Sequence, residues 1–139
     1  MSWISYALLS AMAAAATAVL AKIGVRDVPS TLATAIRTLV ILVFAWAIAI
    51  GGGQHRALGS VSARSLLFLV LSGLATGVSW LAYFRALQLG PASRVAPIDK
   101  LSLGLTLVLA AVFLGEKITL RVALGVGLMI AGALLTLAG

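Results

Sequence analysis

The feature that most constrains this chain is a series of apolar stretches, each about as long as a membrane is thick. A helix needs about 20 mostly apolar residues to cross roughly 30 Å of hydrocarbon. Stretches of this kind follow one another along the sequence, at about residues 3–23, 30–50, 65–89, 95–114 and 119–138. They are continuous rather than alternating, which favours helices over barrel strands. The sequence therefore predicts an all-α integral membrane protein with five transmembrane helices.

The composition agrees with an exterior that is solvated by lipid. Of the 139 residues, 63% are hydrophobic and 9% are charged, and the mean hydropathy is +1.20. A soluble domain averages roughly 45–50% apolar and about 25% charged residues. The basic residues lie mostly at the ends of the apolar stretches, where they suit lipid headgroups and topology signals. We therefore expect a lipid bilayer, and not nucleic acid, as the partner of this positive charge.

Turn residues separate the predicted helices. Gly90-Pro91 is expected to end the third helix, with Gly in a left-handed C-cap and Pro unable to continue the helix. Pro97 is expected in the first turn of the fourth helix, where its missing N–H does no harm. Gly115 is expected to close that helix, and Thr119 to cap the next. The longest connection, about residues 51–64, is polar enough to lie outside the membrane.

Basic residues are distributed almost evenly between the two predicted sides of the membrane. Five spans place the termini on opposite sides, and each side receives four basic residues in the connections or near the ends of the spans. These are Arg56, Arg64, Lys117 and Arg121 on the side of the N-terminus, and Lys22, Arg26, Arg85 and Arg94 on the other. Arg37 and Lys100 lie inside spans, nearer the second side, and adding these two raises its count from four to six. The positive-inside rule needs a clear bias, so the chain can insert in both orientations, unless one flanking residue dominates and imposes a single one.

Several short motifs, in order, resemble the EamA domain of the drug/metabolite transporter (DMT) superfamily. They are Trp80-Leu-Ala-Tyr-Phe-Arg-Ala-Leu-Gln-Leu-Gly90 with Pro97 following, Phe113-Leu-Gly-Glu-Lys-Ile-Thr119, Gly125 and Gly132, and Ala35-Ile-Arg37-Thr-Leu in the second helix. The run Pro97-Ile-Asp99-Lys100-Leu-Ser resembles a single-domain branch of that family. The resemblance covers essentially the whole chain, so we interpret residues 1–139 as one EamA-like transmembrane domain.

The resemblance carries implications for function. Most EamA transporters hold two such domains as an inverted repeat, and inverted repeats place the substrate site near the midplane at their interface. One domain therefore implies a pair, and inverted symmetry requires two oppositely inserted copies. We expect a secondary transporter of small metabolites in the cell membrane that acts as an antiparallel homodimer by alternating access. Two alternatives stay open: a subunit of a lipid-linked-sugar flippase or other heteromeric complex, and a non-transporting membrane scaffold.

Other classes of function lack the residues that they need. The chain has no cysteine, which excludes disulfides, thiol catalysis and Cys-ligated metals. Its single histidine, His55, cannot form a metal site alone. No nucleotide-binding loop or Ser/His/Asp set is present, so we expect neither an enzyme nor a cofactor. Residues 7–20 hold no carboxylate, whereas the resemblance to small multidrug exporters would place a glutamate there, which argues against a closely similar exchange mechanism.

Three charged residues inside predicted spans are candidates for substrate binding or ion coupling. Asp99 and Lys100 lie about one turn into the fourth span, and charges within a span cost several kcal/mol unless they face a cavity or a partner. Asp99 suits a coupling carboxylate and Lys100 an anion contact. Alternatively both lie at the interface, with Lys100 snorkelling and Asp99 near a helix N-terminus. Arg37, about 10 Å into the second span, can contact an anion, pair with Asp99, or reach the interface.

Polar and aromatic residues of the third predicted helix form a second candidate group. Ser79, Trp80 and Tyr83 share one turn, and Trp80 and Tyr83 share a face. Aromatic side chains with a polar edge suit a substrate cavity. They suit an interfacial belt or packing between helices equally well.

Small residues recur at four-residue spacing on two predicted helices. Ala123, Gly127 and Ala131 line one stripe of the fifth helix, and Gly73 and Gly77 line one on the third. Such stripes let helices approach closely. We expect the stripe on the fifth helix to form a dimer interface, since the last helix dimerises in the superfamily's small multidrug-resistance relatives; packing within one copy is the alternative.

Overall fold

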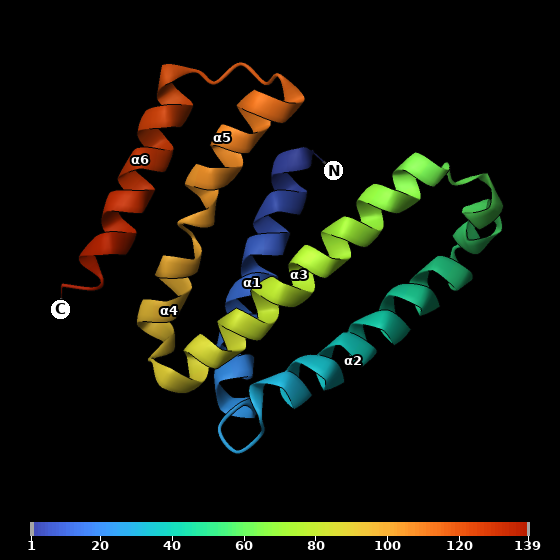
Figure 1. Cartoon of the computed structure of the whole chain (residues 1–139), viewed down its shortest axis with the longest axis horizontal. Coiled ribbons are helices and arrows are strands. Elements are labelled where there is room, and N and C mark those ends of the chain that lie inside the picture. Colours follow the sequence, from blue (N-terminus) through green and yellow to red (C-terminus); the bar gives the residue numbers. More distant parts are fainter. Residues whose placement is uncertain (1, 139) are drawn as a thin grey trace. The chain divides into compact units, whose positions relative to one another are not determined.

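The structure is a computed structural model that describes residues 2–138, and over these residues it consists of helices and their connections (Figure 1). Three long helices come first: α1 (Trp3–Gly24), α2 (Ser30–Gly51) and α3 (Ala63–Leu89). A short 3₁₀ helix, η1 (Gln54–Ser60), joins α2 to α3. The chain continues with α4 (Ala92–Asp99), α5 (Ser102–Leu114) and α6 (Leu120–Leu135).

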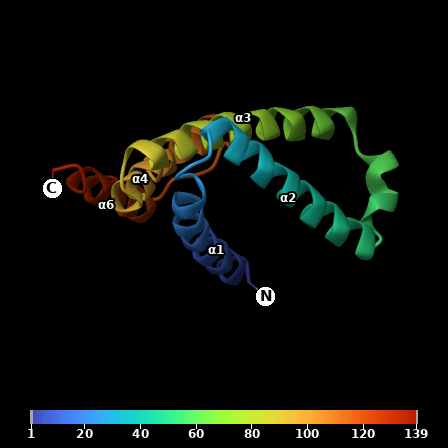
Figure 2. The same cartoon turned by 90° about the horizontal axis from the view of Figure 1, so that it is seen from below.

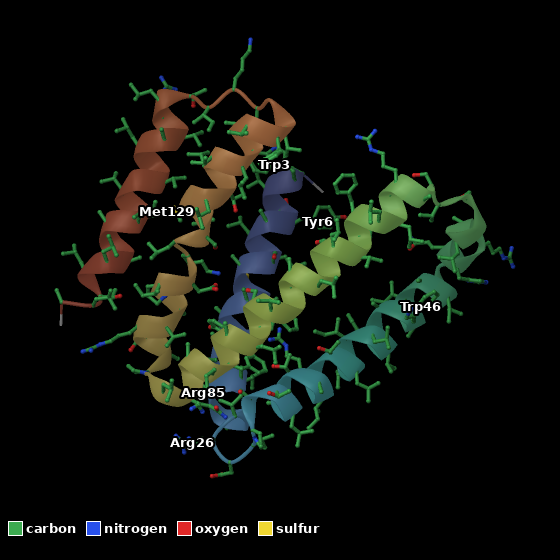
Figure 3. All side chains as sticks on the ribbon, in the orientation of Figure 1. Trp3, Tyr6, Arg26, Trp46, Arg85 and Met129 are labelled. Atoms are coloured by element: carbon green, nitrogen blue, oxygen red, sulfur yellow. The ribbon has the colours of Figure 1, made fainter. Side chains whose placement is uncertain are left out.

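Within residues 2–138, four helical segments are long and apolar enough to cross a membrane. They are α1, α2, α3 and the segment Ala92–Leu114, which contains α4 and α5. Helix α6 is apolar but has 16 residues, or about 24 Å at 1.5 Å per residue. Many large apolar side chains are exposed, among them Trp3, Tyr6, Trp46 and Met129 (Figure 3). Such a surface requires lipid around it, and the prediction of an all-α membrane protein with about five spans is confirmed.

The chain divides into two compact units, which are described separately. Ala21–Gln88 form the first, called the α2–α3 unit, which includes the last turn of α1. Met1–Leu20 and Leu89–Gly139 form the second, called the α4–α6 unit.

The core of the α2–α3 unit lies where α2 begins and α3 ends. Val25 and Phe84 are each 2% exposed, Leu87 is fully buried, and Thr34 of α2 is 7% exposed. The Thr34 hydroxyl donates to the Ser30 carbonyl oxygen at 2.8 Å, which satisfies its polar atom locally. Toward η1 the two helices diverge (Figure 2). The packing that holds α2 to α3 is therefore concentrated at one end of the unit.

Side chains from the ends of α1 and α3 fasten the connection between α1 and α2 to this core. The Gln88 amide Nε2 donates to the carbonyl oxygens of Val25 and Val28, at 3.1 and 2.8 Å. Arg85 Nη1 donates to Gln88 Oε1 at 3.2 Å, and Lys22 Nζ donates to the Leu87 carbonyl oxygen. Figure 3 shows Arg85 and Arg26 at this same end of the unit. Polar side chains thus replace water as partners of the carbonyl groups in the turn.

We expect Gln88→Ala to lower the free energy of unfolding by about 1–3 kcal/mol, because two carbonyl groups lose their donor. The matched control is Gln54→Ala, an exposed residue of η1, with an expected change within about 0.5 kcal/mol. Thermal unfolding in mild detergent measures both. Equal stability of the two variants would contradict a fastening role for Gln88.

The fourth apolar segment is broken inside the span, between α4 and α5. Helix α4 ends at Asp99 and α5 begins at Ser102. The backbone hydrogen bonds across the break run from residue i to residue i−3 at 3.0–3.1 Å: Lys100 to Pro97, Leu101 to Ile98, Leu103 to Lys100 and Gly104 to Leu101. A stretch of 3₁₀ winding within a helix is a common mark of a hinge or of local strain.

Two expectations about this region are wrong. Helix α4 begins at Ala92, so Pro97 lies inside it rather than in its first turn, where the missing N–H costs one helical hydrogen bond. Gly90 has no left-handed C-cap, since Gly53 and Gly115 are the glycines with positive φ among the described residues. Pro91 supplies an extended N-cap for α4 instead, with φ −71° and ψ 142°, so the chain turns without a left-handed residue.

The expected boundaries at the other end of this segment are confirmed. Gly115 takes φ +67° as the C-cap of α5. Thr119 is the N-cap of α6, and its hydroxyl accepts a hydrogen bond from the Val122 amide at 3.4 Å.

Helix α6 packs against α4 and α5. Val126 and Ile130 of α6 are half-buried and Ala133 is 5% exposed. Gly104 of α5 permits a close approach, because a Cβ atom there would lie 2.7 Å from Ile130 Cδ1.

Gly104→Val is therefore expected to push α5 away from α6 and to cost about 1–3 kcal/mol through overpacking. In the control Gly125→Val, the new Cβ atom meets nothing within 4 Å, so stability should be unchanged or slightly higher, since Val is the better helix former. Thermal unfolding of the two variants decides the matter. A Gly104→Val protein as stable as the Gly125→Val protein would show that this helix contact is not close.

Candidate functional site

An arginine stacked on aromatic rings inside the spans is the most distinctive polar feature of the α2–α3 unit. Arg37 of α2 places its guanidinium carbon 3.6 Å from the centroid of the Trp80 ring and 5.4 Å from that of Phe84. Trp80 and Phe84 lie four residues apart on α3 and so share one face of that helix. A cation over an aromatic face gains about 0.5–2 kcal/mol, with the larger values in dry surroundings.

The guanidinium is directed into the span rather than toward its nearer end. Arg37 is seven residues after Ser30, and Trp80 is nine residues before the end of α3 at Leu89, which places Trp80 about 14 Å from that end. The guanidinium carbon lies closer to the ring of Trp80 than to the ring of Phe84. Of these two residues, Phe84 is the one nearer the end of α3 at Leu89. A snorkelling arginine would extend the opposite way. The geometry therefore disfavours the alternative in which Arg37 reaches the interface.

Within the α2–α3 unit, no carboxylate lies within ion-pair distance of Arg37. Of the three acidic residues of the chain, Asp99 pairs with Lys100. Asp27 is exposed in the connection before α2, and Glu116 is exposed in the connection before α6. Within its own unit, the positive charge of Arg37 thus has aromatic neighbours but no anion to neutralise it.

The aromatic group predicted from the sequence is partly assembled at this position. Tyr83 is half-buried, and its ring centroid lies 6.4 Å from that of Phe84. Ser79 is exposed. Sequence reasoning missed Phe84, although its spacing of four residues from Trp80 indicates a shared helix face.

The second predicted charged group lies at the break between α4 and α5. Lys100 Nζ and Asp99 Oδ2 are 3.2 Å apart, and the two side chains are 55% and 38% exposed. The break leaves the C-terminal end of α4 and the N-terminal end of α5 beside this ion pair, where helix dipoles add to the local field. Pairing of Asp99 with Arg37 stays a prediction, because the two residues belong to separate units.

The small-residue stripes differ in what covers them. Ala123, Gly127 and Ala131 are exposed on α6, outside the face that packs against α4 and α5. Gly73 is exposed and Gly77 half-buried on α3. A role of either stripe in a dimer interface stays a prediction.

Residues 2–138 contain no group of three or more His, Cys, Asp or Glu side chains that could hold a metal ion. The chemistry available here is recognition by charge, hydrogen bonds and aromatic faces.

These features define a class of protein: a multi-pass helical membrane protein with charged and aromatic side chains within its spans. A family model described as "EamA-like transporter family" matches residues 1–138, and the chain belongs to this family. It is 55% identical over 134 residues to a protein of Sinorhizobium sp named "Uncharacterized transporter in cobO 3'region". That alignment covers 96% of this chain and 95% of the relative. No solved structure matches the chain. The resemblance seen in the sequence is confirmed.

Arg37→Met is expected to leave the thermal stability unchanged or to raise it. A charged arginine at the centre of a span costs about 2.5–3.5 kcal/mol on insertion scales, more than the cation–π contact restores. Phe84→Ala is the comparison, with an expected loss of about 3–5 kcal/mol because Phe84 is buried. Thermal unfolding in mild detergent measures both. A loss for Arg37→Met as large as that for Phe84→Ala would mark the arginine as a structural element.

Proposed function

We propose that this chain is a secondary transporter of small metabolites in the cell membrane, and that it works as an antiparallel homodimer by alternating access. Membership of the EamA-like transporter family supports the transport role. The relative named as a transporter aligns with this chain over 134 residues, which are 95% of the relative's own length. A protein about as long as this chain is therefore named as a transporter. A five-helix domain is half of an inverted repeat, and a second copy in the opposite orientation supplies the other half.

The observation that carries the antiparallel pair is the even distribution of basic residues. The predicted spans place Arg56, Arg64, Lys117 and Arg121 on one side and Lys22, Arg26, Arg85 and Arg94 on the other, in connections or near helix ends. A chain without a charge bias has little to hold it in one orientation. Both orientations are then available in the same membrane, as the inverted dimer requires.

In this proposal the two charged groups have different tasks. Arg37, Trp80 and Tyr83 form part of the substrate site, and Asp99 with Lys100 couples transport to an ion at the break in the fourth span. The 3₁₀ winding there supplies a hinge about which α5 and α4 can reorient. The exposed stripe of Ala123, Gly127 and Ala131 offers a surface for the second copy. No enzymatic step or cofactor takes part.

The first experiment measures topology. Because the chain has no cysteine, single cysteines placed by Ser2→Cys and Ala138→Cys are probed in cells with a membrane-impermeant thiol reagent. We expect each site to be labelled from outside in roughly half of the molecules, since the charge bias is weak. Labelling of only one of the two sites would exclude an antiparallel homodimer and would favour an oppositely oriented partner protein or a scaffold role.

A pair of variants with fixed orientation then tests whether opposite copies associate. Gln54→Lys with Ser60→Lys adds positive charge to η1, whereas Arg56→Gln in η1 with Arg64→Gln at the start of α3 removes positive charge from the same predicted side. The two proteins should therefore insert in opposite orientations. Carrying different affinity tags and expressed together, they are expected to co-purify. Two copies of the same variant with different tags serve as the control and should not. Co-purification of the same-orientation pair alone would contradict the proposal.

A further inference from the structure

We infer that the substrate of this transporter is a small soluble anion, and that Arg37 binds its carboxylate or phosphate group against the face of Trp80. This inference rests on the transport function proposed above and specifies its substrate class. It follows from three properties of Arg37: its place in the span, its missing counter-charge and the faces that hold its guanidinium.

The place of the guanidinium separates a dissolved anion from a lipid headgroup. Its carbon lies 3.6 Å from the centre of Trp80, at a level about 14 Å from the end of α3. Headgroup phosphates lie at the membrane surface, outside the hydrocarbon core. A phosphate or carboxylate that meets Arg37 therefore belongs to a solute that has entered the protein.

The α2–α3 unit offers Arg37 no counter-charge of its own. Arg37 stays protonated under all ordinary conditions. In a span, such a charge requires a cavity or a partner, and Asp27, the only acidic residue of this unit, is exposed in the connection before α2 and lies beyond ion-pair distance of Arg37. An anionic substrate neutralises the charge when it binds, and the cation in turn repels cationic solutes.

The aromatic faces leave the guanidinium free to make directional hydrogen bonds. Within the α2–α3 unit the guanidinium lies over the faces of Trp80 and Phe84. A ring that covers the flat face of a guanidinium does not block the N–H groups at its edge, which match two oxygens of a carboxylate or phosphate. Trp80 is thus a positioning residue that holds the N–H donors of the Arg37 guanidinium in place.

The test is a binding measurement on the purified protein in mild detergent. The probes are malonate and inorganic phosphate, with tetraethylammonium and glucose at equal concentration as cationic and neutral comparisons. We expect one or both anions to raise the unfolding temperature. Arg37→Gln should weaken that binding about tenfold or more, because the anion loses a pair of charge-assisted hydrogen bonds from the guanidinium. Arg26→Gln, which removes an exposed charge from the same unit, should bind as the unchanged protein does.

A cysteine variant keeps the test decisive if Arg37→Gln folds poorly. In Arg37→Cys the new thiol is the only one in the chain. Reaction with 2-aminoethyl methanethiosulfonate restores a positive charge there and should restore anion binding in part. Methyl methanethiosulfonate adds no charge and should not. The cysteine should also react with a charged, membrane-impermeant methanethiosulfonate, because the site must be open to water, and malonate should slow that reaction.

The outcomes separate the substrate class from the transport function. Unchanged anion binding by Arg37→Gln, or equal restoration of binding by both reagents in the Arg37→Cys protein, overturns the role of Arg37. Binding of tetraethylammonium without any anion overturns the substrate class but leaves a transporter of another class. Retention of anionic lipid in place of either probe assigns the arginine to a lipid. If no probe binds and the topology experiment shows a single orientation, the proposed function fails as well.

Discussion

The absence of water inside a bilayer is the constraint on which the rest of this structure depends. Every backbone and side-chain polar group within the hydrocarbon must find a partner in the protein. The long helices meet this demand for the backbone. The hydroxyl groups of Thr34, Thr38, Thr76 and Thr106 meet it by donating to the carbonyl oxygen four residues earlier, at 2.8–2.9 Å. Where α1 turns into α2, Gln88 and Lys22 donate to carbonyl groups instead.

The same constraint makes the exceptions informative. Within its own unit Arg37 meets aromatic faces but no anion, and the segment Ala92–Leu114 gives up regular helical bonding at the residues that carry the Asp99–Lys100 pair. Polar groups of this kind are costly in a span and are kept where a substrate or an ion needs them. In the proposed mechanism the first is a binding site and the second a hinge with a coupling charge. A protein with so few buried residues obtains further contacts from the surrounding lipid and, in the proposed mechanism, from a second copy.

Much of the candidate site was accessible from the sequence, although its assembly was not. The positions of Arg37, Asp99 and Lys100 inside spans follow from hydropathy, because a charge stands out against apolar neighbours. Trp80 and Tyr83 follow from their polar edges and three-residue spacing. Phe84 was missed because an apolar aromatic residue in an apolar helix carries no such contrast. Pro97 and Gly90 were misplaced because turn chemistry alone does not say how soon α4 begins after α3.

The sequence by itself determined the class of fold, the number of spans to about five, the near-balance of charge across the membrane and the family. These depend on local composition and on the length of apolar runs, which the thickness of a bilayer translates directly into helices. Only the tertiary structure decided that Arg37 meets Trp80 and Phe84, that Gln88 fastens the turn before α2, and that the fourth span breaks beside Asp99. The first two contacts join residues tens of positions apart, and side-chain geometry selects them. The break follows from a local backbone hydrogen-bond pattern, which hydropathy does not record.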